Sequence, residues 1–375
     1  MERADDVLRT VAASVLATAA FGVAADTGPE LRGRIHLDHA FHDADATPLA
    51  NGHALRRARL GGSGSFEDEW SYILEVDFAG GDVSFRDVAL TYSGLAVGDV
   101  SIGHVKVPIG MDEMTSSNHL PFVERALPAA FTQAWRTGVR LSRDGGDYGY
   151  AAMYFGEGLD TVDERVESGG NERFGQALRV FASPWVSGDN RLHVGVAGTR
   201  ETPGHAGDRS VRFSSRPESR PTGVRLVDTG RIEDVDKVRR LGLETGARLG
   251  PVVLQAERLG ARVQLDDGTR QRFDGHSLQA TWTLVGEPRS YRNGTFATPR
   301  PRAGASAWEV GLRLSEIDLD DGNIRGGQQQ NITLGLNFYP RENVKFMANF
   351  IRVESERQDM ADDPRILLFR TQVSF

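Results

Sequence analysis

Hydrophobic and polar residues alternate along most of this chain, and the pattern is clearest at its C-terminal end. In the segment RILLFRTQVSF (365–375), Leu367, Phe369 and Phe375 fall on one face and Arg370 falls on the other. Side chains on a β-strand alternate between its two faces with a period of two. The pattern therefore predicts a strand with one apolar face that continues to the final aromatic residue, which a frayed terminus in water would rarely show.

The same two-residue period recurs in many segments, of which 71–78, 308–315 and 332–338 are clear examples. Short sequences rich in Gly, Asp, Asn or Pro separate the segments and predict tight turns: 79–82, 143–149, 265–269 and 338–343. Longer polar stretches predict loops: 157–172, 199–223, 286–304 and 354–365. Long loops on one side of the strands and short turns on the other are typical of a membrane β-barrel.

The first 25 residues have the features of a secretion signal. An apolar stretch runs from residue 11 to about residue 20, and small residues follow at a cleavage position near Ala24 or Ala25. Three acidic residues lie before Arg9, although this region of a signal should be positive, so we expect the true start near Val7 or Leu8. We therefore expect a signal peptide over 1–25 and a single β-domain over 26–375.

Two all-β architectures fit this pattern. A soluble sandwich alternates apolar and polar residues as a barrel does. The secretion signal, the aromatic residues at strand ends and the charged residues on the polar faces favour a transmembrane antiparallel β-barrel. An open sheet cannot enter lipid, because its edge amides would lack partners. The barrel is the preferred prediction, and a secreted sandwich remains the alternative.

Composition narrows the classes of function. The chain has no cysteine, which excludes disulfides, thiolate metal sites and cysteine nucleophiles. Its net charge of −8 gives no basic field for nucleic acid, and we expect no nucleic-acid partner. Only three of its 44 basic residues are lysines, so arginine, with its flat fork of donors for phosphate and carboxylate, dominates. We expect no cofactor, no metal site and no enzymatic activity.

The segment VSIGHVKVPIGMDEMTSSNHLPFVERALPAAF (100–131) resembles the phosphate-selective porin O and P family. In that family a strand ends in a Gly-x-x-Lys-x-Pro-x-Gly turn, followed by Thr-Ser-Ser-Asn and Glu-Arg. Further blocks that resemble the family occur along the chain in the family's order: 55–61, 72–81, 212–230, 284–296 and 326–355. The resemblance implies an outer-membrane barrel of about 16 strands with loops folded into the lumen, usually trimeric, that passes anions through an arginine-lined channel.

The arginine-rich stretch 212–225 holds the first group of candidate anion-binding residues. Two prolines in it rule out a central strand. If the stretch folds inward, as the resemblance favours, its guanidinium groups could form successive phosphate sites; a solvated external loop is the alternative. The candidates are Arg212, Arg216, Arg220 and Arg225.

A second group of candidates lies on the predicted early strands. In LRRARL (55–60), parity puts Arg57 and Arg59 on the inner face, whereas the family points to the pair Arg56 and Arg57; a β-bulge would reconcile the two. Lys106, in the family's turn, is the expected constriction cation, and Asp77 its expected acidic counterpart. Arg34 is a further candidate for lining the lumen.

These observations predict an outer-membrane porin for passive, anion-selective diffusion, with phosphate or polyphosphate as the favoured solute. Arginines in a narrow pore replace part of an anion's hydration shell and focus positive potential even in an acidic protein. The expected partners are inorganic phosphate or other small anions, outer-membrane lipid, further copies in a homotrimer, and the barrel assembly machinery, through Phe375. A non-conducting structural or adhesive barrel, a less selective general porin and a barrel-type hydrolase remain alternatives.

Overall fold

The fold is described from a computed structural model of the chain, which describes residues 27–375 except 82, 160–170 and 204–208. The expected signal peptide, residues 1–25, lies outside the described residues, as does most of the acidic stretch 160–172. No helix in the described ranges is long and apolar enough to span a bilayer.

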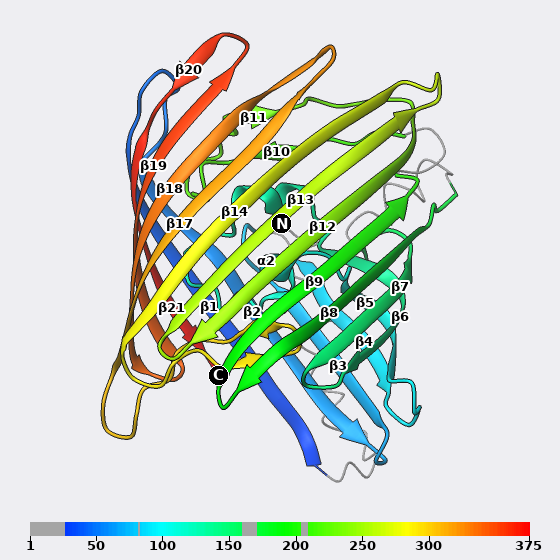
Figure 1. The fold of residues 1–375 in the computed structure, drawn as a ribbon, viewed down its shortest axis with the longest axis vertical. Helices are drawn as coiled ribbons and strands as arrows, with labels where there is room; N and C mark the ends of the chain where they lie inside the picture. The colour runs from blue at the N-terminus through cyan, green and yellow to red at the C-terminus, as the bar shows by residue number, and fades with distance from the viewer. Residues whose placement is uncertain (1–26, 82, 160–170, 204–208) are drawn as a thin grey trace, which may run out of the picture.

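Sixteen antiparallel strands form one closed barrel (Figure 1). The strands are β1 (Thr27–Asp43), β2 (Gly52–Phe66), β3 (Trp70–Asp77), β4 (Ser84–Tyr92), β5 (Asp99–Lys106), β6 (Trp135–Asp144), β7 (Tyr148–Phe155), β8 (Gly175–Ser187), β9 (Asn190–Glu201), β12 (Val235–Leu249), β13 (Val252–Leu265), β14 (Arg270–Val285), β17 (Ala307–Asp321), β18 (Ile324–Arg341), β19 (Val344–Arg357) and β21 (Arg365–Ser374). A short strand, β20 (Met360–Asp362), pairs only with β19. Because β1 pairs with both β2 and β21, the sheet has no free edge, so the barrel prediction is confirmed and the sandwich is wrong.

Strand β21 confirms the alternation predicted for the end of the chain. Leu367 and Phe369 are exposed on the outer face, whereas Arg370 and Gln372 are buried inside. The backbone of Phe375 exchanges hydrogen bonds with Gly33 at 2.9 and 3.0 Å, which holds the terminus against β1. The apolar outer face suits contact with lipid acyl chains.

The wall of the barrel is uneven in height. Strands β3 to β7 have 8–10 residues, whereas β12, β13, β14, β17, β18 and β19 have 14–18. Figure 1 shows the short strands together on one side. The connection 107–134 starts and ends in this low wall, between β5 and β6.

One long connection lies at the end of the barrel opposite to the one expected. The segment 286–306 follows the twelfth barrel strand, β14, and therefore lies at the same end as the start of β1 and the end of β21, with the short turns (Figure 1). It carries a small hairpin, β15 (Tyr291–Arg292) with β16 (Thr295–Phe296), and buries Phe296 against Met111. Polar composition identifies a loop, but only counting every strand correctly assigns its end.

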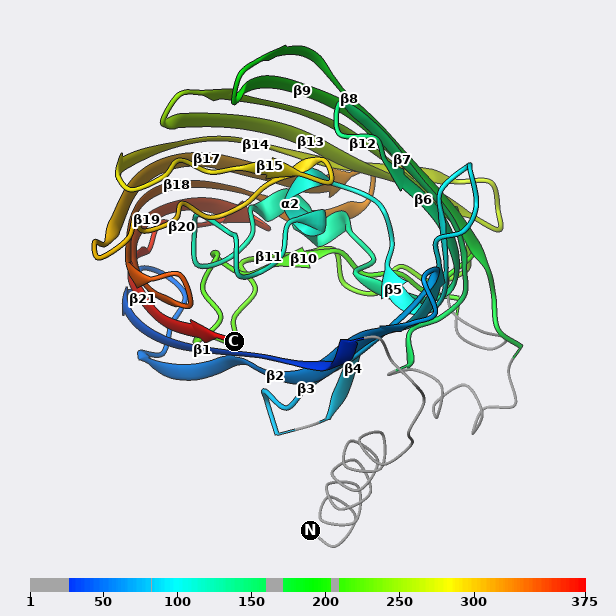
Figure 2. The same cartoon turned by 90° about the horizontal axis from the view of Figure 1, so that it is seen from below.

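Among the described residues, two long connections at the opposite end fold into the lumen, where Figure 2 shows them inside the ring of strands. The first, 107–134, carries α2 (Met111–Met114) and a 3-10 turn, η1 (Leu127–Phe131). The second, 209–234, carries the paired strands β10 (Ser214–Ser215) and β11 (Val227–Asp228). The largest buried cluster of the barrel includes Phe131 and Phe213 from these two connections. The predicted inward loops are thus confirmed.

Candidate functional site

The connection 107–134 is held in the lumen by its backbone and by one aromatic side chain. Gly110 has a φ of 77°, which favours glycine, and turns the chain from β5 into α2. Phe122 is fully buried against Gly311 and Gly335 of the opposite wall, where a Cβ atom would lie 3.0 Å from its ring. The two glycines therefore make the space that this ring fills.

Inward polar side chains of the wall pair with the backbone of the same connection. The Lys345 ammonium donates to the carbonyl of Leu120 at 2.6 Å, and Asn337 donates to that of Pro121 at 2.8 Å. Asn349 accepts from the amide of Val123 at 2.8 Å. Buried peptide groups need such partners, so these contacts fix the path of the connection as well as its depth.

The second connection packs against the first. The Phe213 ring lies 5.3 Å from Phe131 and 5.6 Å from Phe273 of β14, measured between ring centroids. Glu218 is buried and accepts from Arg313 and Thr333, and Ser219 bonds His42 at 3.0 Å. The external-loop alternative for this stretch is therefore wrong.

A hollow of about 450 Å³ lies between the first six strands and α2; we call it the basic hollow. Eight basic residues line it: Arg34, Arg56, Arg57, Arg59, Arg86, Lys106, Arg125 and Arg140. Three acidic residues line it as well: Glu75, Asp87 and Glu113. Its lining thus carries five more basic than acidic groups, although the whole chain is acidic.

Four carboxylates in and beside the basic hollow each contact two cations. The contacts are Glu75 with Arg34 (2.8 Å) and Arg59 (3.0 Å), Asp77 with Arg59 (2.9 Å) and Arg86 (3.3 Å), Glu113 with Lys106 (3.2 Å) and Arg125 (3.3 Å), and Glu124 with Arg56 (2.6 Å) and Arg370 (3.0 Å). Burial opposes ionisation of Glu113, but the nearby cations Arg125 and Lys106 outweigh it and lower its pKa. One carboxylate between two cations holds both in place and leaves an excess of positive charge.

A β-bulge puts both arginines of the pair inside the barrel. His36 lies opposite Arg57, but the next residue, Leu37, lies opposite Leu55, so Arg56 is the additional residue on β2. Arg57 is buried beside His36, and Arg56 reaches Glu124. The strand pairing thus allows the strand parity and the family resemblance both to hold.

Two arginines of the basic hollow lack a carboxylate partner among the described residues: Arg57 and Arg140. In both, the Nε–H group is buried without a hydrogen-bond acceptor in the protein. Arg57 makes one long contact, 3.4 Å from Nη1 to the His36 Nδ1 atom. A buried donor without an acceptor is costly, so these two groups are the ones most in need of an anionic partner.

A second hollow, of about 240 Å³, shares Arg56, Glu113 and Arg125 with the basic hollow and therefore adjoins it. It is also lined by Arg216 and Arg220 from the inward connection. Burial, together with repulsion from Arg220 and Arg225, lowers the pKa of Arg216 to about 10, so this side chain stays charged at neutral pH. We call this second space the upper hollow.

Several predicted residues lie elsewhere or have other partners. Lys106 lines the basic hollow, but its carboxylate is Glu113, and the predicted counterpart Asp77 instead holds Arg59 and Arg86. The alternation of residues in 71–78 places Asp77 on the polar face of its strand, but it does not show which cation Asp77 contacts. Glu124 and Arg125, neighbours in the chain, pair with different residues: Glu124 with Arg56, and Arg125 with Glu113.

The four arginines of 212–225 do not act as one group. Arg212 is 55% exposed in its side chain, pairs with Asp228 and lines a separate hollow of about 420 Å³. Arg225 is exposed and lines neither the basic nor the upper hollow. Arg212 precedes β10, whereas the other three arginines lie between β10 and β11, so their order in the sequence does not reveal which of them line the upper hollow.

Three residues of the site, Arg140, Arg125 and Trp135, are not among the residues predicted from the sequence. Arg140 alternates with outward Val139 on β6, so strand parity would have found it. Arg125 lies in an irregular segment, where no periodic signal exists. The ring of Trp135 contacts three cations. The charged groups of Arg59, Arg86 and Lys106 lie 5.2, 5.1 and 5.0 Å from its centroid, and these cation–π contacts form only when the strands come together in the barrel.

Comparison with known proteins places the barrel in a wider group. Residues 30–375 match the sequence model of the family described as phosphate-selective porin O and P. "Porin O" of Pseudomonas aeruginosa is 25% identical over 374 residues, which cover 88% of this chain and 83% of that protein. An uncharacterised protein of Caulobacter vibrioides is 28% identical and covers 87% of this chain and 68% of its own length.

Solved structures share the architecture. An anion-selective porin from Comamonas acidovorans has a TM-score of 0.57 at 14% identity, covering 93% of this chain and 99% of that one. The trimer form of OmpT, an outer-membrane protein of Vibrio cholerae, has a TM-score of 0.58 at 13% identity, covering 92% and 99%. At such identities the likeness concerns the fold alone. The family match covers nearly the whole barrel, and this chain therefore belongs to the phosphate-selective porin O and P family of the outer membrane.

Proposed function

We propose that the barrel is a passive, anion-selective channel whose favoured solute is phosphate or polyphosphate. The observation that supports this most is the pair of adjoining hollows, in which eight basic residues and three acidic residues line the larger space. The low-dielectric wall around them concentrates the positive potential. The preference for phosphate rests on arginine, whose planar fork can donate two parallel hydrogen bonds to a phosphate.

The proposed path for an anion begins at Arg216 and Arg220 in the upper hollow. It continues past Arg56 and Arg125, which line both hollows, toward Arg57 in the basic hollow. Each step offers donors that replace lost water. The shared carboxylates keep the positive charge moderate, and an ion must be released as readily as it is bound for conduction.

The double variant Arg216→Gln/Arg220→Gln is expected to weaken phosphate block of chloride current by about tenfold or more, because each lost charge-assisted hydrogen bond contributes roughly 1.5–3 kcal/mol. The reversal potential across a planar bilayer in asymmetric chloride should shift toward zero. Arg352→Gln is a matched control, since this arginine is exposed outside the barrel and pairs with Glu354. An unchanged reversal potential in the double variant would remove these residues from the path.

A non-conducting barrel is the second candidate, and the tight packing inside the lumen favours it. Phe122, Phe131 and Phe213 are all buried there. Folded protein that gives no channel events would support this alternative. Anion current that phosphate does not block would instead support a less selective general porin.

We also propose that three copies assemble through the low wall of β3 to β7 and that Phe375 is presented to the barrel assembly machinery. The Vibrio cholerae relative in fold is described in a trimer form, and Phe375 is 60% exposed. Native mass spectrometry of protein extracted from membranes in mild detergent is expected to give three chains. Monomers only, at concentrations where conductance is retained, would contradict the trimer.

A further inference from the structure

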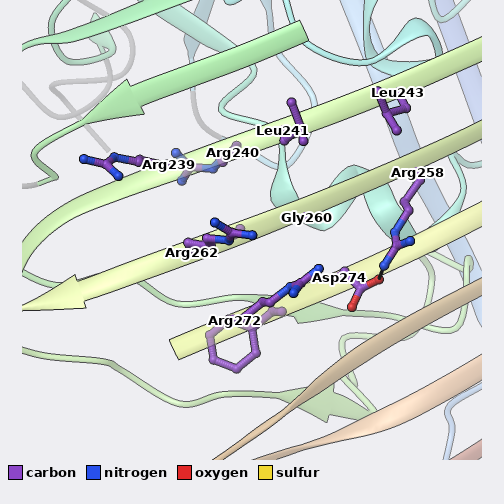
Figure 3. A pocket seen from close by; sticks show the side chains of 11 residues that line it. Arg239, Arg240, Leu241, Leu243, Arg258, Gly260, Arg262, Arg272 and Asp274 are labelled. Atoms are coloured by element: carbon purple, nitrogen blue, oxygen red, sulfur yellow. Dashed lines mark hydrogen bonds and ion pairs between the residues drawn. The ribbon is translucent and has the colours of Figure 1, made fainter. Parts of the chain in front are cut away.

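Four arginines lie side by side on the outer face of the barrel. Arg200 of β9 lies opposite Arg239 of β12, Arg239 lies opposite Arg262 of β13, and Arg262 lies opposite Arg272 of β14. Figure 3 shows three of them, Arg239, Arg262 and Arg272, on adjacent strands. We call the four residues the arginine row.

The arginine row faces outward, away from the channel. All four side chains are exposed, and each alternates with a buried neighbour that faces the lumen. Two hollows of about 300 and 310 Å³ lie on this surface, and Arg239, Arg262 and Arg272 line both of them. The row is therefore independent of the anion path inside the barrel.

No ion pair in the described part of the chain involves an arginine of the row, and the nearby Asp321 carboxylate accepts a hydrogen bond from the backbone amide of Arg272. Of the neighbouring carboxylates, Asp274 pairs with Arg258 at 2.8 Å and Asp236 pairs with Lys237 at 2.9 Å. Like charges placed directly opposite each other on a sheet repel. Four arginines in one row therefore destabilise the bare surface, and an anionic ligand that bridges them would relieve the repulsion.

The surroundings of the arginine row indicate an amphiphile. The row lies near the start of β12 and β14 and the ends of β9 and β13, at the barrel end opposite the start of β1 and the end of β21. On the same outer face of β12, Leu241 and Leu243 follow Arg239, with 57% and 51% of their surface exposed. A ligand that fits both parts carries anionic groups beside the arginines and apolar chains beside the leucines.

We propose that the arginine row binds the phosphate groups of a phosphorylated glycolipid in the outer leaflet of the outer membrane. The guanidinium groups donate to the phosphate oxygens, and the acyl chains pack along Leu241 and Leu243. A free phosphate ion would use only the arginines and would leave the leucines uncovered. The proposal requires only the outer-membrane location and does not depend on which ion the channel carries.

The test uses the full-length protein in detergent and measures retention of bis-phosphorylated lipid A by native mass spectrometry. Arg239→Gln/Arg262→Gln is expected to lower the affinity on the order of 30-fold. Each arginine at an anionic lipid surface contributes about 1 kcal/mol, and about 1.4 kcal/mol corresponds to a tenfold change in affinity. Arg352→Gln, which removes an outward arginine from another strand, is expected to leave binding unchanged. Chemically dephosphorylated lipid A should bind the wild type as weakly as lipid A binds the double variant.

Three results would overturn the proposal. Equal retention of lipid A by the double variant and the wild type would remove the row from the site. Full competition by millimolar inorganic phosphate would indicate a free-anion site instead of a lipid site. Dissociation of lipid-free oligomers in the double variant would indicate that the row is a contact between copies of the chain. Unchanged conductance and heat-modifiable migration of the variant will show that it folds.

Discussion

Replacing Arg370 by leucine is expected to lower the free energy of unfolding by about 3–5 kcal/mol, because the change leaves the buried carboxylate of Asp38 without its cation. Arg370 is buried inside β21, next to the seam where the barrel closes. Its guanidinium donates to both oxygens of Asp38 at 2.6 and 2.7 Å, and to Glu124 at 3.0 Å. It also donates to the carbonyl of Val123, so one side chain connects two strands and the inward connection.

The loss can be measured by urea unfolding in lipid vesicles, followed by tryptophan fluorescence. Arg352→Leu is the matched control: it breaks an exposed pair with Glu354, and such pairs contribute at most about 1 kcal/mol. The double variant Asp38→Leu/Arg370→Leu should recover part of the loss, since it removes a buried charge along with its partner. Equal effects of Arg370→Leu and Arg352→Leu would show that the buried contacts contribute little.

The barrel could be predicted from the sequence because its signal is local. A strand reveals its two faces in five or six residues, so the alternation of Leu367, Phe369 and Arg370 was sufficient to place each of them. The bulge beside Arg56 was foreseen only because parity and the family resemblance disagreed there. Where two independent patterns conflict at one position, an irregularity in the strand is a reasonable expectation.

The partners inside the lumen could not be predicted, since they depend on the path that the inward connection takes and not on distance along the chain. Lys106 pairs with Glu113, seven positions later, and Asp77 with Arg59 from the preceding strand. Charge type alone does not distinguish these pairings from the expected one between Lys106 and Asp77. The choice depends on where α2 turns into the lumen, and this is decided by buried contacts of the connection with the far wall.

Phe122 is the contact on which the inward position of that connection depends most. Its ring fills the space left by Gly311 and Gly335 and lies under the Arg313 guanidinium, 4.5 Å from the ring centroid. Phe122→Ala is expected to weaken this anchoring by about 3–5 kcal/mol, the usual loss for a buried phenylalanine. Because Glu113 and Arg125 lie on the same connection, a loosened segment no longer holds them beside Lys106 and Arg56.

The expected result is a wider and less selective pore. Single-channel recordings of Phe122→Ala should show a larger conductance, a reversal potential closer to zero and weaker block by phosphate. Phe350→Ala is the matched control, since this phenylalanine is exposed on the outer face of β19 and its loss leaves the lumen intact. A variant that folds and conducts like the wild type would show that the polar contacts of Lys345, Asn337 and Asn349 hold the connection without the aromatic ring. In that case the selectivity would depend on the hydrogen bonds of the wall and not on the packing of Phe122.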